Sequence, residues 1–166
     1  MLFRSSKAGR MAINEQMEKT RADYGGEVTG HISFRENGCN DDAFWSAALM
    51  AQAISNSGMP LSKTVAQLPH YFSLPEMRLP CPDENKSSVV EKIRKSLFEK
   101  YPKNIVAIDG VRLDLPNAWG LVRVSNTEPQ ITLRFEGKTK EELKKIFRIF
   151  AGELGEHKIS MTWKGK

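Results

Sequence analysis

The chain has 166 residues, of which 40% are hydrophobic and 27% are charged, enough for one domain of ordinary size or two small ones. This apolar content excludes an intrinsically disordered chain. The longest apolar run, Ala47–Ala51, is far shorter than the roughly 20 residues that a bilayer requires. A membrane span is therefore excluded.

Charge and cysteine usage narrow the function classes further. The formal net charge of +5 and a pI near 9.2 indicate an anionic partner, but the basic residues are spread along the whole chain. That spread weakens the case for a nucleic-acid-binding arm. Cys39 and Cys81 have no CxxC partner and no metal-ligand spacing, which argues against a disulfide framework and against a zinc site. We expect a reducing, cytoplasmic setting.

The first third of the chain predicts short elements around a glycine-rich bend. Residues 13–20 predict a helix with Ile13 and Met17 on one face. The segment 24–31 contains three glycines and predicts a backbone that bends sharply or lies close to a ligand. A strand is expected over His31–Phe34.

A longer helix is expected next. Asn40 or Asp41 is predicted to cap it, and Gly58 to end it. Its expected buried face consists of Phe44, Ala47, Ala48, Ala51 and Ile54. Prolines then recur from residue 60 to residue 82, and a linker is predicted around Tyr71–Pro75.

Helix and hairpin signals follow the proline-rich stretch. Ser88–Glu91 matches a capping box and predicts the start of a helix, whose expected inner positions are Val89, Ile93, Leu97 and Tyr101. Asp109-Gly110 predicts a two-residue hairpin between strands Asn104–Ile108 and Val111–Leu115.

The last third predicts two strands, a helix and a final strand. The strands are expected over Leu121–Val124 and Gln130–Phe135, where apolar and polar residues alternate. Thr139–Glu142 is a second capping box, opening a helix whose inward residues are Leu143, Ile146, Phe147 and Phe150. The alternation of Ile159, Met161 and Trp163 predicts the final strand.

These elements predict an α+β protein. We expect a C-terminal antiparallel sheet of four to five strands covered by two helices, preceded by a truncated α/β piece. The expected domains are residues 1–72 and 73–166. The first has too few elements to close a core alone, which favours self-association through it.

Two loops carry the chemistry. In the first, Glu27, Thr29 and His31 offer a carboxylate, a hydroxyl and an imidazole, and a carboxylate can accept hydrogen bonds from two neighbouring sugar hydroxyls. The alternative interpretation is a glycine-rich turn in which Glu27 is solvated and His31 packs at a strand start. The local residues alone do not decide between the two.

The second loop, Arg123–Pro129, suits a phosphate. Arg123 offers a planar fork of donors, Ser125 and Thr127 offer hydroxyls, and Asn126 offers an amide. A tight turn there would also expose backbone N–H groups as an anion nest. The alternative is a turn whose Asn, Ser and Thr side chains bond to their own backbone.

Together the two loops resemble the α-D-phosphohexomutase superfamily, and within it the phosphomannomutase/phosphoglucomutase type. The resemblance rests on Glu-x-Ser/Thr-Gly-His followed well downstream by Arg-x-Ser-Asn-Thr-Glu-Pro, and extends from about Gly9 to the last helix. It implies the end of domain 3, whose loop reads the sugar hydroxyls, and the whole of domain 4, whose loop binds the phosphate that is not transferred. Thr29 stands where the family usually has serine.

The resemblance assigns roles residue by residue. Glu27, Thr29 and His31 are expected to bind the sugar, and Arg10 falls where some members place another substrate contact. The expected phosphate-binding residues are Arg123, Ser125, Asn126 and Thr127, and Asn126 favours the mannose/glucose branch. The family's catalytic serine motif and its Asp-Gly-Asp-x-Asp magnesium loop are not found in this sequence.

The resemblance therefore implies the substrate-binding C-terminal part of an enzyme that interconverts hexose 6-phosphate and hexose 1-phosphate. The full enzyme is expected to use Mg²⁺ and a hexose 1,6-bisphosphate activator, neither held by this chain's own residues. This chain alone is expected to bind mannose or glucose phosphate without turnover, and to associate with the missing N-terminal domains. The alternative is a stand-alone basic module for nucleic acid or an acidic protein, which lacks aromatic residues among its basic ones and any nucleic-acid motif.

Overall fold

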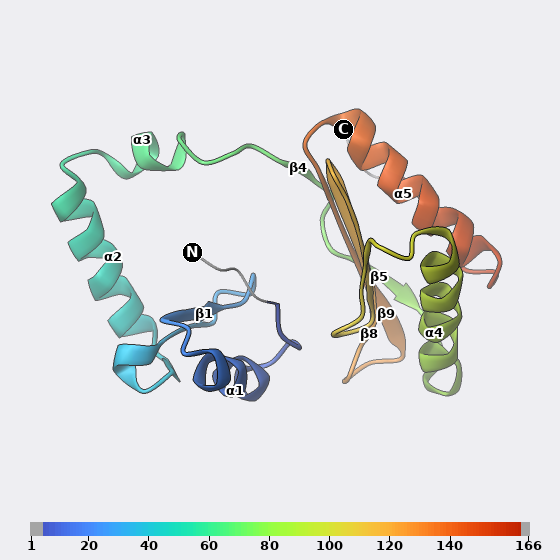
Figure 1. The fold of residues 1–166 in the computed structure, drawn as a ribbon, viewed down its shortest axis with the longest axis horizontal. Helices are drawn as coiled ribbons and strands as arrows, with labels where there is room; N and C mark the ends of the chain where they lie inside the picture. Colours follow the sequence, from blue (N-terminus) through green and yellow to red (C-terminus); the bar gives the residue numbers. More distant parts are fainter. Residues whose placement is uncertain (1–4, 164–166) are drawn as a thin grey trace. The chain divides into compact units, whose positions relative to one another are not determined.

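The computed structural model describes residues 5–163, which form two compact units that divide after Pro69 (Figure 1). We call them the N-terminal unit and the C-terminal unit and describe each by itself. Five α-helices and two antiparallel sheets make up the described part of the chain, so the expected α+β class is confirmed. No helix among these residues is long and apolar enough to cross a membrane.

The N-terminal unit packs one helix on a small sheet. Helix α1 (Arg10–Thr20) buries Ile13 and Met17, as predicted, although it begins three residues earlier than expected. The sheet is antiparallel in the order β1-β2-β3, with a 3₁₀ turn η1 before the last strand; the bounds are Tyr24–Gly26, Ile32–Phe34, Asn40–Asp41 and, for η1, Arg35–Asn37. Only Cys39 joins the two helix residues in the buried cluster described for this unit.

Gly25 lets α1 lie directly on the sheet. A Cβ at this position would stand 2.5 Å from Met17 Sδ and 2.6 Å from Ile13 Cγ2, closer than real Cβ contacts allow. The glycine of β1 thus leaves the space that the two core residues of α1 fill. This close approach is the packing reason for one of the three glycines in the bend.

Helix α2 (Ala43–Ser57) ends at Gly58 as predicted, but two details of the expectation are wrong. The cap is Asp42, whose side chain accepts a hydrogen bond from the Trp45 N–H, rather than Asn40 or Asp41. No residue of α2 is buried, and Phe44 is 91% exposed. The apolar pattern was correct for a helix, but no described element of this unit packs along that face. The short α3 (Leu61–Val65) follows.

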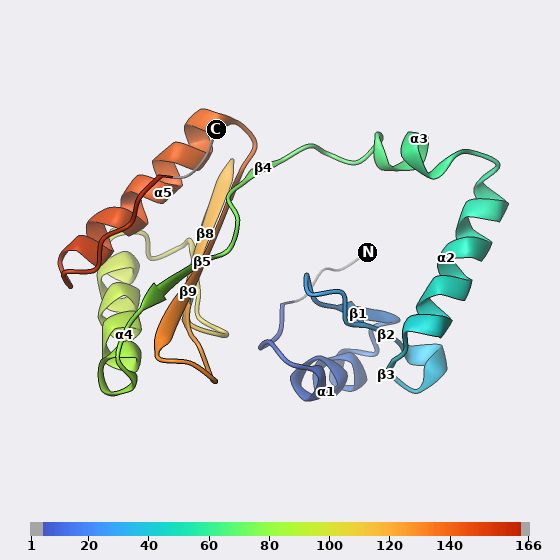
Figure 2. The same cartoon turned by 180° about the vertical axis from the view of Figure 1, so that it is seen from behind.

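The C-terminal unit is a six-stranded antiparallel sheet covered on one face by two helices (Figure 2). The strand order is β4-β9-β8-β7-β6, and β5 also pairs with β9. The helices are α4 (Asp83–Lys100) and α5 (Lys140–Gly155). The strand bounds are Phe72–Ser73, Met77–Pro80, Ile105–Val106, Val111–Leu115, Ala118–Val124 and Gln130–Gly137 for β4 to β9 in turn.

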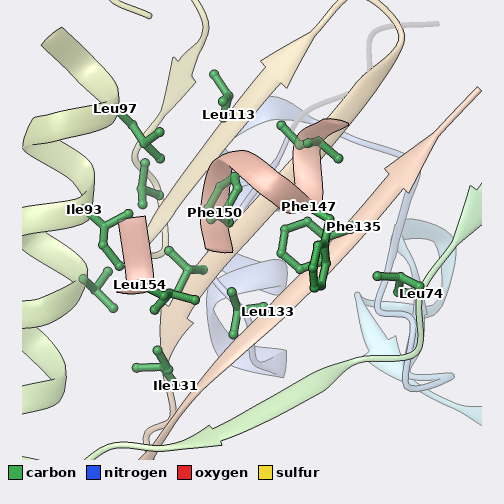
Figure 3. Packing of buried hydrophobic residues seen from close by; sticks show 14 of the residues in the cluster. Leu74, Ile93, Leu97, Leu113, Ile131, Leu133, Phe135, Phe147, Phe150 and Leu154 are labelled. Atoms are coloured by element: carbon green, nitrogen blue, oxygen red, sulfur yellow. The ribbon is translucent and has the colours of Figure 1, made fainter. Parts of the chain in front are cut away.

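The core of this unit lies between the sheet and the two helices (Figure 3). Phe135 of β9 meets Phe147 and Phe150 of α5 edge to face, with ring centroids 5.6 and 5.4 Å apart. Gly120 of β8 makes room for these rings, because a Cβ there would stand 2.6 Å from Phe150 Cε2. The inward residues predicted for α5 are all buried, and the Thr139 hydroxyl caps the helix by accepting from the Glu142 N–H.

Helix α4 begins at Asp83, five residues before the predicted capping box at Ser88. Pro82 stands at the cap, with Asp83 and Glu84 in the first turn, where carboxylates are favoured by the helix dipole. The residues it buries are Val90, Ile93 and Leu97. Local resemblance to a capping box inside a helix caused the error.

Several strand limits also differ from the prediction. The loop between β6 and β7 spans residues 107–110, four residues rather than two, and Gly110 has the positive φ of 76° that the turn requires. Strand β8 begins at Ala118, three residues before the predicted start at Leu121. Residues 159–163 form no strand, although their apolar side chains pack against the core.

The predicted linker around Tyr71–Pro75 overlaps the sheet. Phe72 and Ser73 pair with Gly137 and Glu136 of β9, and Leu74 is buried. Strand β5, which lay in the proline-rich stretch, was not predicted. It pairs only with β9 and ends at a proline, which an outer strand tolerates because its missing N–H costs no central ladder bond.

Candidate functional site

The first candidate loop is the tight turn of the β1–β2 hairpin. The Glu27 N–H donates to the His31 carbonyl at 2.9 Å, and the Gly30 N–H donates to the Glu27 carbonyl at 3.0 Å. Gly30 closes this turn with a φ of 91°, a conformation that side chains rarely adopt. Thr29 lies at the exposed tip. The turn therefore carries Glu27, Thr29 and His31 on one short, defined backbone.

The Glu27 carboxylate is held in place from one side. Its Oε1 accepts a hydrogen bond of 2.8 Å from the backbone N–H of Gly9, the residue that precedes α1. The residue is half-buried and the hydrogen bond itself is exposed to solvent. An ionised carboxylate has about four acceptor positions, and one hydrogen bond leaves the others for a ligand.

His31 is oriented by Asp41, a residue that the sequence analysis had assigned to helix capping. His31 Nδ1 lies 2.6 Å from Asp41 Oδ2, and Asp41 Oδ1 accepts from the Ile32 N–H at 3.2 Å. The hydrogen bond from His31 is the main reason that the pKa of Asp41 is lowered, and the nearby Arg10 charge lowers it further. With Nδ1–H donating to the carboxylate, Nε2 is the nitrogen that remains for a ligand.

Arg10 is the first residue of α1 and its side chain is exposed. Its charge acts on Asp41, and its neighbour Gly9 binds Glu27. The start of α1 therefore lies beside the hairpin turn. Arg10, Glu27 and His31 belong to one group within the N-terminal unit, together with the unpredicted Asp41.

The second candidate loop joins β8 to β9 over residues 125–129. Ser125 is buried, and its backbone N–H donates to the Gln130 carbonyl at 3.0 Å, which closes the loop base. Its Oγ accepts from the N–H groups of Thr127 and Glu128 at 3.4 and 3.2 Å. The Ser125 side chain thus bonds the loop's own backbone, as the alternative interpretation of this segment held. The side chains of Asn126 and Thr127 are exposed.

Arg123 stands two residues before this loop on β8. Its Nη1 lies 3.9 Å from Asp109 Oδ2 in the turn between β6 and β7. The backbone of that turn packs directly on Arg123, because a Cβ at Gly110 would lie 2.7 Å from Arg123 Cα. The guanidinium is half-buried and held near its sheet position, with donors still available for an anion.

Lys86 on α4 also contacts this loop and was not predicted from the sequence. Its Nζ donates to the carbonyls of Ser125 and Glu128. Lys86 lies 39 residues before Ser125, and nothing in the sequence indicates a contact over that separation. The residues predicted to bind phosphate, namely Arg123, Ser125, Asn126 and Thr127, all belong to the C-terminal unit, whereas the sugar-binding candidates belong to the N-terminal unit.

Comparison with known families decides the identity of these two segments. A model described as "Phosphoglucomutase/phosphomannomutase, alpha/beta/alpha domain III" matches residues 3–72, and one described as "Phosphoglucomutase/phosphomannomutase, C-terminal domain" matches residues 76–153. The chain belongs to the phosphoglucomutase/phosphomannomutase family. The resemblance stated from the two loops is confirmed, and the chain corresponds to domain III and the C-terminal domain of this family.

Individual proteins of the same family are also similar to this chain. The chain is 35% identical over 149 residues to the phosphomannomutase/phosphoglucomutase of Pseudomonas aeruginosa, covering 89% of this chain and 32% of that protein. It is 34% identical over 146 residues to the phosphoglucomutase of Neisseria gonorrhoeae, covering 87% and 32%. The chain thus spans about a third of the length of the curated relatives it matches.

A solved structure has the same fold. The crystal structure of a phosphoglucomutase/phosphomannomutase family protein from Burkholderia thailandensis superimposes with a TM-score of 0.81 and 28% identity. The match covers 94% of this chain and 34% of that chain. Likeness over nearly the whole chain places both units within a family architecture.

Proposed function

We propose that this chain is the substrate-binding C-terminal portion of a phosphomannomutase/phosphoglucomutase, an enzyme that interconverts hexose 6-phosphate and hexose 1-phosphate. The observation that carries the proposal is the order of two family domains along one chain, each bearing the loop expected of it. The names of the relatives support a hexose phosphate as the ligand class.

In this proposal the sugar is bound by the hairpin of the N-terminal unit. Glu27 accepts hydrogen bonds from two neighbouring ring hydroxyls, and the Gly9 N–H keeps its carboxylate oriented. Thr29 adds a hydroxyl, and His31 offers Nε2 while Asp41 holds Nδ1. A carboxylate that reads two adjacent hydroxyls can bind the ring in two opposed directions, which a phosphoryl transfer between O6 and O1 requires.

The phosphate that is not being transferred is bound by the C-terminal unit. Arg123 supplies a planar pair of donors that matches two phosphate oxygens. Ser125 Oγ already accepts two backbone hydrogen bonds, so its own proton is the group left to donate to the anion. Asn126 and Thr127 add exposed polar side chains. Three or four such bonds correspond to a Kd in the range of roughly 1 μM to 1 mM.

We further propose that the Mg²⁺ and the hexose 1,6-bisphosphate of the family reaction act in the whole enzyme. Among residues 5–163 no group of three or more His, Cys, Asp or Glu side chains is arranged to hold a metal ion. In this proposal the roles of the described residues are binding and orientation. Turnover by this chain alone is not expected.

The uncovered face of α2 fits the rest of the same enzyme. Phe44 is 91% exposed and Ala47, Ala48 and Ala51 on the same face are exposed, although the matching family model describes an alpha/beta/alpha domain. We infer that the remaining part of domain III packs on this face. Mixing the chain with the remaining part of the enzyme should give a stable complex that Phe44→Glu weakens, with Glu99→Lys as a surface control. Self-association of the chain alone is the other outcome to be scored.

Calorimetric titration of the full chain tests the binding proposal. Glucose 1-phosphate and mannose 1-phosphate are expected to bind saturably, and Arg123→Ala to abolish binding. Arg148→Ala, which removes an exposed arginine from α5, should leave it unchanged. Binding to a short DNA duplex that falls steeply with salt and ignores Arg123→Ala would instead support the basic-module alternative and overturn the proposal.

A further inference from the structure

Lys86 lies in the first turn of α4 with its ammonium group fully engaged. The side chain is only 14% exposed. Its Nζ stands 2.6 Å from the Ser125 carbonyl, 3.2 Å from the Glu128 carbonyl and 2.6 Å from Asp83 Oδ1. A lysine ammonium has three protons, and three acceptors surround this one. No donor is left to contact a ligand directly.

The two carbonyls belong to opposite ends of the loop 125–129. Ser125 follows β8 and Glu128 lies two residues before β9, so Lys86 ties both ends of the loop to α4. The loop's other bonds are local: the Ser125 N–H and the Gln130 N–H donate to the Gln130 and Glu128 carbonyls, and Ser125 Oγ accepts from two N–H groups of the loop. Two other contacts reach the loop from outside: the Cys81 N–H donates to the Pro129 carbonyl at 2.9 Å, and Arg78 of β5 lies 4.0 Å from the Glu128 carboxylate. Among the described residues, Lys86 is the charged side chain that donates to carbonyls of this loop.

The contact between Lys86 and the Ser125 carbonyl also fixes the direction of the next backbone N–H. The carbonyl of Ser125 and the N–H of Asn126 belong to one trans peptide, so they point in opposite directions. Because the Ser125 carbonyl is drawn toward Lys86, the Asn126 N–H points away from α4, on the side where Asn126 is exposed. An N–H turned outward beside exposed Asn126 and Thr127 is oriented to donate to an anion.

Placing the Lys86 ammonium at this position lowers the stability of the fold unless acceptors surround it. A buried ammonium loses hydration, and a cation in the first turn of a helix opposes the helix dipole. Asp83, in the same turn, compensates for part of this cost through its carboxylate. An apolar side chain would fill the space without those costs, but it would donate to neither carbonyl, whereas the Lys86 ammonium donates to both.

We propose that Lys86 is a positioning residue for the phosphate-binding loop: it holds the Ser125 and Glu128 carbonyls inward so that the Asn126 N–H faces the anion. The phosphate contact rests on the proposed function, whereas the loop conformation does not. Lys86 acts through the loop backbone and makes no contact with substrate.

Two variants of the full chain distinguish the effect of the Lys86 ammonium group from the effect of the packing of its side-chain stem. Lys86→Met keeps the stem and removes the ammonium, and Lys86→Arg keeps a cationic donor. Lys92→Met, at an exposed position six residues further along α4, is the matched control. With inorganic phosphate as the probe, Lys86→Met is expected to weaken binding at least tenfold at a temperature where the chain is folded. Lys86→Arg should recover most of the affinity and Lys92→Met should match the parent chain.

A ligand-free readout keeps the two proposals distinguishable. The ¹H–¹⁵N heteronuclear NOE of residues 126–128 is expected to fall in Lys86→Met and to stay unchanged in Lys92→Met. If the parent chain binds no phosphate, the proposed function fails, and the NOE alone then decides the role of Lys86. Unchanged NOE values in Lys86→Met, or parent-level phosphate affinity in that variant, would overturn the inference.

Discussion

The two units of this chain support their binding loops in different ways. The phosphate-loop candidate joins two neighbouring strands of a six-stranded sheet whose inner face is covered by α4 and α5. The sugar-loop candidate is a hairpin over a buried cluster described as Ile13, Met17 and Cys39. The two motifs are equally easy to find in the sequence, but the buried cluster described beneath the phosphate-loop candidate is much larger than the one beneath the sugar-loop candidate. Recognising a binding loop in the sequence does not tell how firmly the fold holds it, because that depends on which elements pack on the strands that carry the loop.

The largest difference should come from the core of the C-terminal unit. Phe150 is fully buried against Phe135, so Phe150→Ala is expected to cost about 3–5 kcal/mol of unfolding free energy in this unit. Phe98→Ala, at a half-exposed position of α4, should stay within about 0.5 kcal/mol. Urea unfolding followed by assigned amide signals measures each unit separately. Equal costs for the two substitutions would contradict the packing described.

A glycine pair tests how the phosphate loop is supported. Gly110 combines a φ of 76° with a site where a Cβ would lie 2.2 Å from the Val122 carbonyl oxygen. Gly110→Ala is expected to cost about 2 kcal/mol or more and to weaken phosphate binding through displacement of Arg123. Gly152→Ala, with nothing within 4 Å of its added Cβ, should stabilise α5 by about 0.5–1 kcal/mol. Thermal unfolding and calorimetry on both variants check the pair, and the same sign for both would refute it.

The ion pair between α4 and α5 should have a smaller effect. Glu153 is 4% exposed, and its Oε1 lies 2.7 Å from Lys100 Nζ, whose pKa is raised by that hydrogen bond. Since a raised lysine pKa stabilises the folded state below the ordinary value of about 10.4, the contribution is complete at neutral pH and is lost as pH rises through the raised value.

Removal of Lys100 leaves a buried carboxylate without its partner. Lys100→Met is expected to cost about 1–2 kcal/mol at pH 7, a value reduced by the exposure of the lysine. The double variant with Glu153→Gln should recover most of it. Denaturant unfolding at pH 7 and above pH 10.5 makes the comparison, and a cost that did not shrink at high pH would count against the ion pair.

The smallest expected effect concerns the sugar-loop candidate. The pKa of Asp41 is lowered mainly by the His31 hydrogen bond, so its contribution is present above its ordinary value of about 3.9 and is lost as pH falls through the lowered one. The amide signal of Ile32, which donates to Asp41, should therefore titrate below about pH 4. Asp41→Asn should abolish that titration, and Glu36→Gln should leave it. An Ile32 signal that titrates normally in Asp41→Asn would exclude the contact.

Local sequence signals predicted the elements whose limits are set locally. Thr139 caps α5 and Gly58 ends α2 because a hydroxyl and a left-handed glycine act within one turn. The capping box at Ser88 failed because the same residue types are tolerated inside a helix. The segment 159–163 alternates like a strand, but its apolar side chains pack against the core without its backbone joining the sheet.

Contacts between distant segments escaped the sequence analysis. The binding candidates of both loops could be named because their residues are consecutive. Asp41 and Lys86 reach those loops across 10 and 39 residues, and only the folded chain brings them together. The apolar face of α2 is a second example. Its sequence pattern indicates which residues can be buried but not which element will cover them.

Amide shift mapping of the full chain with two ligands tests the central claim most directly. Inorganic phosphate is expected to shift the signals of residues 123–127 alone. Glucose 1-phosphate is expected to shift these and also the signals of residues 27–31, because only the sugar offers hydroxyls to Glu27. A glucose 1-phosphate titration that shifts the signals of neither loop, or shifts that persist unaltered in Arg123→Ala, would contradict the assignment of a hexose-phosphate site to this chain.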